Sequence, residues 1–148
     1  MRVLCGGLLA DALAAAGAGV VEEARRARDG QDRTQLAAIA ARAATAAQKQ
    51  PAAKRAQYEA ALVHSYWAEV LAELRDQAAA RQAAEAGIAL AEKAVALESN
   101  SAEHHRLLGT LYGQVIPGNV AMGLRYGRKT LEELDRALAL DPKNPEVY

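Results

Sequence analysis

The sequence predicts an all-α fold, built as a solenoid of antiparallel helix hairpins. The first observation is composition. Hydrophobic residues make up 51% of the 148 residues, yet aromatics make up only 4% and phenylalanine is absent, so alanine and leucine supply most of the apolar surface. These two residues favour helices, whereas strands favour β-branched and aromatic residues. The second observation is that apolar residues recur at helical spacing, in segments whose ends resemble one another.

Charge and cysteine content exclude several classes of function. The 18 Lys and Arg residues balance the 18 Asp and Glu residues, which gives a formal net charge of +0. A neutral chain has no field that attracts nucleic acid or an anionic membrane, and we expect neither partner. Because Cys5 is the only cysteine, the chain contains neither an intramolecular disulfide nor a cysteine-based structural zinc site.

Residues 1–19 resemble a secretory signal peptide. Arg2 precedes an apolar stretch, and Ala16-Gly17-Ala18 has the small-x-small form of a cleavage site. Asp11 interrupts the apolar stretch, and the alternative is a helix packed on the rest of the chain. A transmembrane anchor needs about 20 predominantly apolar residues, so we expect no membrane span. The signal peptide predicts an exported or periplasmic protein, and the alternative is a cytoplasmic one.

Residues 20–148 form the predicted helical repeat domain. A first helical segment, "VVEEARRAR", ends at Asp29-Gly30. Its arginines indicate either a solvated helix face with i,i+3 and i,i+4 ion pairs or a basic docking patch. Four longer helices follow, over about 33–50, 52–74, 78–97 (after a turn near residues 75–77) and 102–115. Asp32 is a predicted cap of the first of these, and Gln50-Pro51 ends it.

Three helix ends can be superposed on one another. The segments are "TAAQKQP" at 45–51, "KAVALES" at 93–99 and "RALALDP" at 136–142, and their intervals are 48 (Ala46 to Ala94) and 43 residues (Ala94 to Ala137). We interpret them as the same position in successive helix pairs. A single hairpin cannot bury its apolar face alone, so neighbouring hairpins are expected to stack.

The last unit resembles the tetratricopeptide repeat (TPR) family. Leu108-Gly109 with Tyr112 is similar to the Leu-Gly-x-x-Tyr of that family's first helix. Leu134, Ala137 and Pro142 match positions of its second helix, and Asn144-Pro145 resembles the start of another repeat. The middle unit matches more weakly, at Ala61, Ala94 and Ser99. The resemblance implies a right-handed solenoid whose first helices line a concave, peptide-binding face.

Two features depart from the family. The intervals exceed its usual period of about 34 residues. We attribute the excess in the last unit to a loop over residues 115–129, "VIPGNVAMGLRYGRK", because Pro117, Gly118, Gly123 and Gly127 interrupt a helical pattern there. The combination of an export-like segment, long helices and this insertion is similar to a group of exported bacterial TPR proteins.

No residue pattern indicates an enzyme or a cofactor. His104 and His105 are adjacent, and neighbouring helical residues point about 100° apart, so they cannot chelate one metal from one helix. A site that adds His64 lacks matching carboxylates, and no nucleophile motif or phosphate loop is present. Partial burial of His105 is the favoured interpretation. We therefore expect a non-enzymatic scaffold that needs neither metal nor cofactor.

The expected partner is a peptide or protein held on the concave face. Tyr58, Tyr66, Trp67 and Tyr112 lie on first helices, and packing is favoured over ligand contact for Trp67 and Tyr112. Polar residues of the first helices and the residues of the predicted loop are the candidate contacts. They are Gln57, His64, Glu69, Arg106, Gln114, Asn119, Met122, Arg125 and Tyr126. The carboxylate-clamp pattern of chaperone-binding TPR proteins is not matched, since Arg106, Thr110 and Gln114 do not reproduce it.

The last residues raise a second possibility for partners. "ALALDPKNPEVY" closes one unit and begins another near residue 144. Solenoids need a polar terminal cap, and nothing after Pro145 supplies one. We expect either an incomplete N-terminal part of a longer protein or a last hairpin covered by a partner or a second copy. The alternative functions are a self-association module and the recruiting arm of a longer enzyme or membrane protein.

Overall fold

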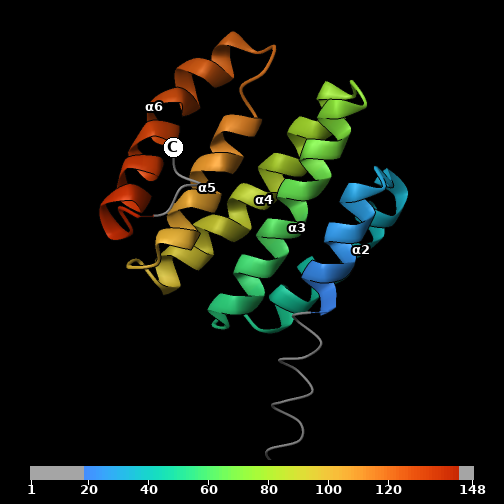
Figure 1. The fold of residues 1–148 in the computed structure, drawn as a ribbon, viewed down its shortest axis with the longest axis horizontal. Coiled ribbons are helices and arrows are strands. Elements are labelled where there is room, and N and C mark those ends of the chain that lie inside the picture. The colour runs from blue at the N-terminus through green and yellow to red at the C-terminus, as the bar shows by residue number, and fades with distance from the viewer. Residues whose placement is uncertain (1–18, 144–148) are drawn as a thin grey trace, which may run out of the picture.

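The fold is all-helical, as predicted. The computed structural model describes residues 19–143, and within them a helix over residues 19–29 is followed by α2 (Arg33–Lys49), α3 (Lys54–Glu73), α4 (Gln77–Leu97), α5 (Ala102–Gln114) and α6 (Val120–Leu140) (Figure 1). These described residues contain no strand. The predicted signal peptide lies almost wholly outside the described residues, as does the predicted start of another repeat after residue 143.

Side-chain caps fix the starts of four helices. Asp32, Asp76, Ser101 and Asn119 each accept a hydrogen bond from the backbone N–H three residues later, at 2.9, 3.2, 3.3 and 3.1 Å. This satisfies one of the donors that every helix start leaves without a partner. The cap predicted at Asp32 is confirmed. Short connections between capped starts and the preceding helix ends make consecutive helices antiparallel neighbours.

Consecutive helices pack side by side from α2 to α6, and α3 also contacts α5 (Figure 1). The latter contact joins the first helices of two successive hairpins. The three superposable segments end α2, α4 and α6, each the second helix of its pair. The structure is therefore repeat-like and compatible with a solenoid.

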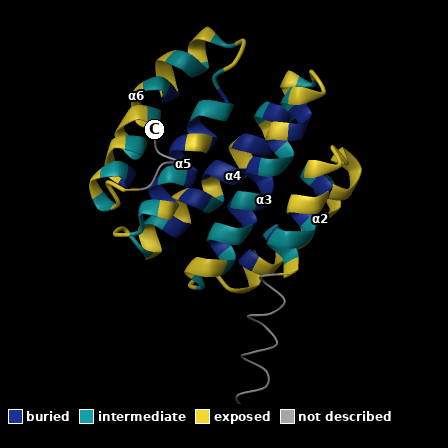
Figure 2. Cartoon of the chain, in the orientation of Figure 1, coloured by how far each residue is buried: buried dark blue, intermediate teal, exposed yellow. Residues whose placement is uncertain are grey.

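The main core lies between α3, α4 and α5, where Leu71, Leu107 and Leu111 are buried almost completely (Figure 2). A second cluster packs the 19–29 helix and α2 against α3, and Trp67 contacts both clusters. The favoured packing role of Trp67 and Tyr112 is thus confirmed. Many core positions are alanines, because small residues let helix backbones approach closely.

Gly87 marks the closest approach in this core. A Cβ atom at Gly87 would lie 2.7 Å from Leu111 Cδ2 and 3.0 Å from His64 Cβ. Both neighbours are buried, so α4 meets α3 and α5 at a point that only glycine fits without movement.

The predicted loop over residues 115–129 is wrong, because the chain is helical from Val120 onward and only residues 115–119 connect α5 to α6. Asn119 caps the new helix, and Tyr126 stacks on Tyr112 with ring centroids 5.2 Å apart. Both contacts favour a helix here and oppose the cost of about 1 kcal/mol that each helical glycine carries. Gly118 is the described glycine with a positive φ, +70°.

Between residues 19 and 143, no helix is both long enough and apolar enough to cross a bilayer.

Candidate binding groove

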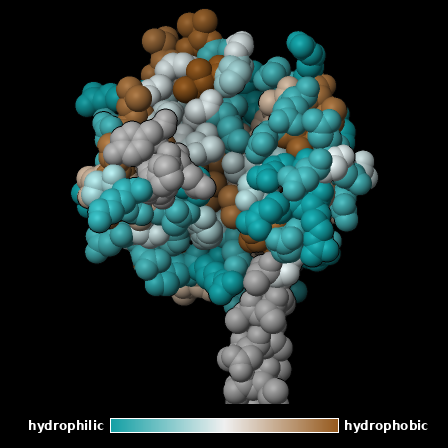
Figure 3. All heavy atoms as spheres, viewed as in Figure 1, coloured by the Kyte–Doolittle hydropathy of each residue, from teal (hydrophilic) through white to brown (hydrophobic). Residues whose placement is uncertain are grey.

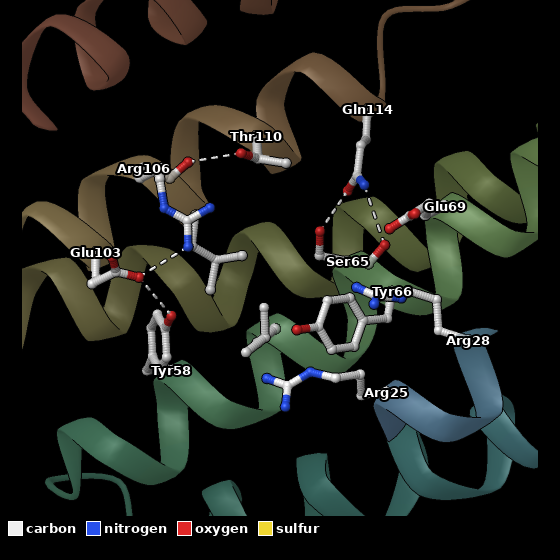
Figure 4. Close-up of a pocket in the computed structure, with 12 residues that line it drawn as sticks. Arg25, Arg28, Tyr58, Ser65, Tyr66, Glu69, Glu103, Arg106, Thr110 and Gln114 are labelled. Atoms are coloured by element: carbon white, nitrogen blue, oxygen red, sulfur yellow. Dashed lines mark hydrogen bonds and ion pairs between the residues drawn. The ribbon is translucent and has the colours of Figure 1, made fainter. Parts of the chain in front are cut away.

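A groove of about 520 Å³ lies along the 19–29 helix, α3 and α5 (Figure 4). These are alternate helices of the array, the first helix of each pair. Half-buried Leu62 of α3 contributes apolar surface above the buried Leu107 of α5, and charged and hydroxyl side chains surround it. The full lining consists of Arg25, Arg28, Tyr58, Leu62, Ser65, Tyr66, Glu69, Glu103, Arg106, Leu107, Thr110 and Gln114.

One wall of the groove carries two arginines and a tyrosine. The Arg28 guanidinium lies 4.5 Å from the centre of the Tyr66 ring, a cation–π distance, and it donates to Asp29 Oδ1. Arg25, one turn earlier, donates to Glu22 at 2.9 Å and lies beside the Tyr66 hydroxyl. The two guanidinium groups of this wall are therefore oriented by protein partners before any ligand arrives.

The opposite wall is built around Glu103 of α5. Its carboxylate accepts hydrogen bonds from Arg106 at 2.9 Å and from the Tyr58 hydroxyl at 3.2 Å (Figure 4). Burial, with the nearby Glu103 charge as a smaller cause, raises the pKa of Tyr58 to about 12. Tyr58 thus stays a neutral hydrogen-bond donor at physiological pH and ties α3 to α5.

A reciprocal pair of hydrogen bonds closes one end of the groove. Ser65 Oγ donates to Gln114 Oε1, and Gln114 Nε2 donates to the Ser65 carbonyl oxygen, both at 3.2 Å. Glu69 lies one turn farther along α3 (Figure 4). Desolvation raises the pKa of Glu69, and the Arg28 charge opposes this rise. The groove therefore places a carboxylate and two cations near one end.

Three of the predicted contact residues lie together in this groove. Glu69, Arg106 and Gln114 all line it, although they are separated by up to 45 positions, from 69 to 114. Helical spacing had placed them on first helices, and the packing of α3 against α5 brings them to one surface.

Gln57 and His64 lie in the interior, so their prediction as surface contacts is corrected. Gln57 is 1% exposed, and its amide nitrogen donates to the carbonyl oxygens of Ala47 (2.9 Å) and Gln50 (3.1 Å), which end α2. His64 Nδ1 lies 2.8 Å from the Ala60 carbonyl oxygen. Desolvation lowers the pKa of His64 and outweighs the opposing effect of that hydrogen bond.

The other four predicted contacts lie on or beside α6, away from the groove and outside any long loop. Asn119 is the α6 cap, Met122 packs against the core, and Tyr126 is buried. Arg125 is exposed, with its guanidinium 5.1 Å from the centre of the Tyr126 ring. Three of the four therefore hold α6 in place, and Arg125 alone presents a free surface.

Sequence reasoning missed Arg25, Arg28 and Glu103 as parts of a site. The docking alternative for the "VVEEARRAR" arginines pointed toward the first two, but their partner Tyr66 is about 40 residues away. Helix order was the one sequence signal for this site. First helices of successive hairpins lie side by side, so the arginines of the 19–29 helix could have been expected beside α3.

His104 and His105 have separate structural roles, and the predicted burial of His105 is confirmed. His104 Nδ1 lies 3.0 Å from the Ala94 carbonyl oxygen, and its ring stacks on Tyr58. His105 lies 2.6 Å from Glu133 Oε2 and 2.8 Å from the Ser99 carbonyl oxygen. The part of the chain that the structure describes contains no group of three or more His, Cys, Asp or Glu side chains placed to hold a metal.

Comparison of the chain with family models, curated proteins and solved structures finds no significant match.

Proposed function

We propose that the chain is a non-enzymatic binding module that holds a peptide, or an exposed segment of a partner protein, in the groove. In this proposal the hairpins form a right-handed solenoid of the TPR type, and the groove is its concave face. The observation that supports this proposal is that the residues lining the groove all come from alternate helices. The 19–29 helix, α3 and α5 contribute every lining residue, although α2 and α4 lie between them in the chain.

The chemistry of the groove suits a peptide that carries both apolar and charged side chains. Half-buried Leu62 offers apolar surface, whose burial supplies affinity. The arginines of one wall and the Glu103–Arg106 ion pair of the other place different charged groups on the two sides, which favours one orientation of the ligand. Several small contacts on a preformed surface limit the ordering cost of binding.

The proposal can be tested with a pair of matched substitutions. Thr110 is an exposed residue that lines the groove, and its hydroxyl donates to the Arg106 carbonyl oxygen at 2.9 Å. Thr45 of α2 is also exposed, and its hydroxyl donates to the Ala41 carbonyl oxygen at 3.0 Å. Thr110→Trp fills the groove, whereas Thr45→Trp places the same bulk in an equivalent helical setting away from it.

The assay uses a phage-displayed library of random peptides, selected on the immobilised chain. Enriched peptides are then synthesised, and their affinity is measured by fluorescence anisotropy. We expect Thr110→Trp to weaken binding at least about tenfold, equivalent to about 1.4 kcal/mol, and Thr45→Trp to leave it unchanged. A selection that enriches no peptide, or equal affinity for the two variants, would contradict the proposal.

A further inference from the structure

The outer face of α6 exposes an apolar stripe that no described residue covers. Val120 is 82% exposed, Leu124 is 83% exposed and Leu131 is 65% exposed. The other exposed large hydrophobic residues among those described, Leu74 and Leu97, reach 43% and 41%. Hydrophobic atoms gather over the first turns of α6, at the top of the view (Figure 3).

This stripe has the spacing of a helix-pairing seam. Val120, Leu124, Gly127 and Leu131 follow one another at intervals of four, three and four residues. The pattern continues with the half-buried Leu138 and with the half-buried Leu134, whose side chain also packs against Gly109 of α5. That is the alternation by which two helices interlock side chains along a shared seam. No atom lies within 4 Å of a Cβ built at Gly127, so the middle of the seam is a hollow.

The charges beside the seam favour an antiparallel pair of α6 helices, in which a basic residue of one copy lies near an acidic residue of the other. Arg128 in the first half of the helix and Asp135 in the second half each follow a seam position by one residue, and Arg128 also donates to Glu132 of its own chain at 2.7 Å. In an antiparallel pair, the first half of one helix lies beside the second half of the other. Arg128 of one copy then lies on the same side of the seam as Asp135 of the partner subunit, whereas a parallel pair would bring like charges together.

We propose that a second copy of this chain docks on the outer face of α6, with the two α6 helices antiparallel and a two-fold axis near Lys129. In this register Leu131 enters the hollow at Gly127 of the partner subunit. Leu124 lies opposite the partner's Leu134, and Val120 lies opposite the partner's Leu138. Every large apolar residue of the stripe thus gains an apolar neighbour, as an isologous interface requires.

The surface of α2, at the opposite end of the array, favours a closed dimer over an open chain of copies. An open chain would need a second apolar surface that receives α6. The exposed residues of α2, at that other end, include Ala41, Thr45 and Lys49, and none is a large hydrophobic residue. α6 is therefore complementary to itself and lacks such a counterpart on α2. The inference is independent of the groove, because no α6 residue lines it.

The first test is the mass of the full chain in solution, measured by size-exclusion chromatography with light scattering over a concentration series. We expect the wild-type chain to approach the mass of two chains as concentration rises. Leu131→Glu should remain at the mass of one chain with unchanged helical circular dichroism. Leu97→Glu is the control, because it places the same charge on an exposed leucine of α4, and it should still dimerise.

The second test shows whether a second copy of the chain binds α6 and whether the two α6 helices are antiparallel. Arg125→Glu with Arg128→Glu makes the edge wholly acidic, and Glu132→Arg with Asp135→Arg makes it wholly basic. Each double variant should be monomeric alone, and an equimolar mixture should form a complex of one copy of each. A wild-type chain that stays monomeric throughout would overturn the proposal and assign the stripe to a different partner. Double variants that fail to pair with each other would overturn the antiparallel register.

Discussion

Replacement of Gly87 by alanine tests whether helix packing in this protein is limited by backbone approach. The new methyl group would lie 2.7 Å from Leu111 Cδ2 and 3.0 Å from His64 Cβ. Leu111 is 0% exposed, and His64 Cβ is fixed directly to the α3 backbone. Neither neighbour can move into solvent, so α4 must shift away from α3 and α5.

Two opposing contributions set the size of the effect. Alanine in place of glycine inside a helix stabilises it by up to about 1 kcal/mol. Overpacking of a well-filled core costs about 1 to 3 kcal/mol. We therefore expect Gly87→Ala to change the free energy of unfolding by between about zero and 3 kcal/mol, in the destabilising direction.

A matched substitution separates these contributions. Gly127→Ala makes the same change within α6, where no atom lies within 4 Å of the new methyl group. It should stabilise the monomer by up to about 1 kcal/mol at low protein concentration. The difference between the two variants is then the packing cost alone, about 1 to 3 kcal/mol.

Thermal and urea unfolding, followed by circular dichroism, measure both variants. At about 2 to 4 °C per kcal/mol, Gly87→Ala should melt roughly 2 to 12 °C below Gly127→Ala. Equal melting temperatures would refute the reasoning, because they would show that α4 accommodates a methyl group at its closest approach without cost.

Two further predictions concern a helix cap and a buried histidine. Ser101→Ala removes the acceptor of the His104 N–H and should destabilise the chain by about 1 kcal/mol in urea unfolding, whereas Ser99→Ala, an exposed control, should change little. The lowered pKa of His64 means that the unfolded chain binds more protons, so stability should fall as pH drops below about 6.5, by at most about 1.4 kcal/mol per pH unit. His64→Leu should show a shallower fall in the same measurement, and an identical pH dependence would rule out His64 as its source.

The sequence predicts most of this fold because the signals at the helix ends are local. Asp32 caps α2, Pro51 follows its end, and the ends of α4 and α6 repeat the same pattern. The start of α6 could not be predicted in this way. Gly123 and Gly127 weaken the helix locally, and the stack of Tyr126 on Tyr112 decides in its favour. That contact joins two helices, so a local pattern does not contain it.

The groove was predicted only in part, for a related reason. Helix order placed Glu69, Arg106 and Gln114 on first helices, where the groove lies. The polar side chain of Gln57 predicted a surface position for this residue on α3. Its phase on α3 instead turns it toward the carbonyl oxygens that end α2, which accept its amide hydrogens. Polarity cannot distinguish a surface amide from one that satisfies a neighbouring helix end.

α6 lies apart from the groove, since no α6 residue lines it. Pairing through α6 should therefore leave both grooves open, and a dimer should present two peptide sites. On a surface that displays many copies of the peptide, the apparent affinity of a dimer should then be about 10²- to 10⁴-fold higher than that of a monomer, because the second contact is intramolecular. Leu131→Glu should remove this gain in surface plasmon resonance and leave the affinity for free peptide in solution unchanged. An equal loss in both formats would show instead that α6 supports the groove itself, and the two surfaces would then have to be treated as one site.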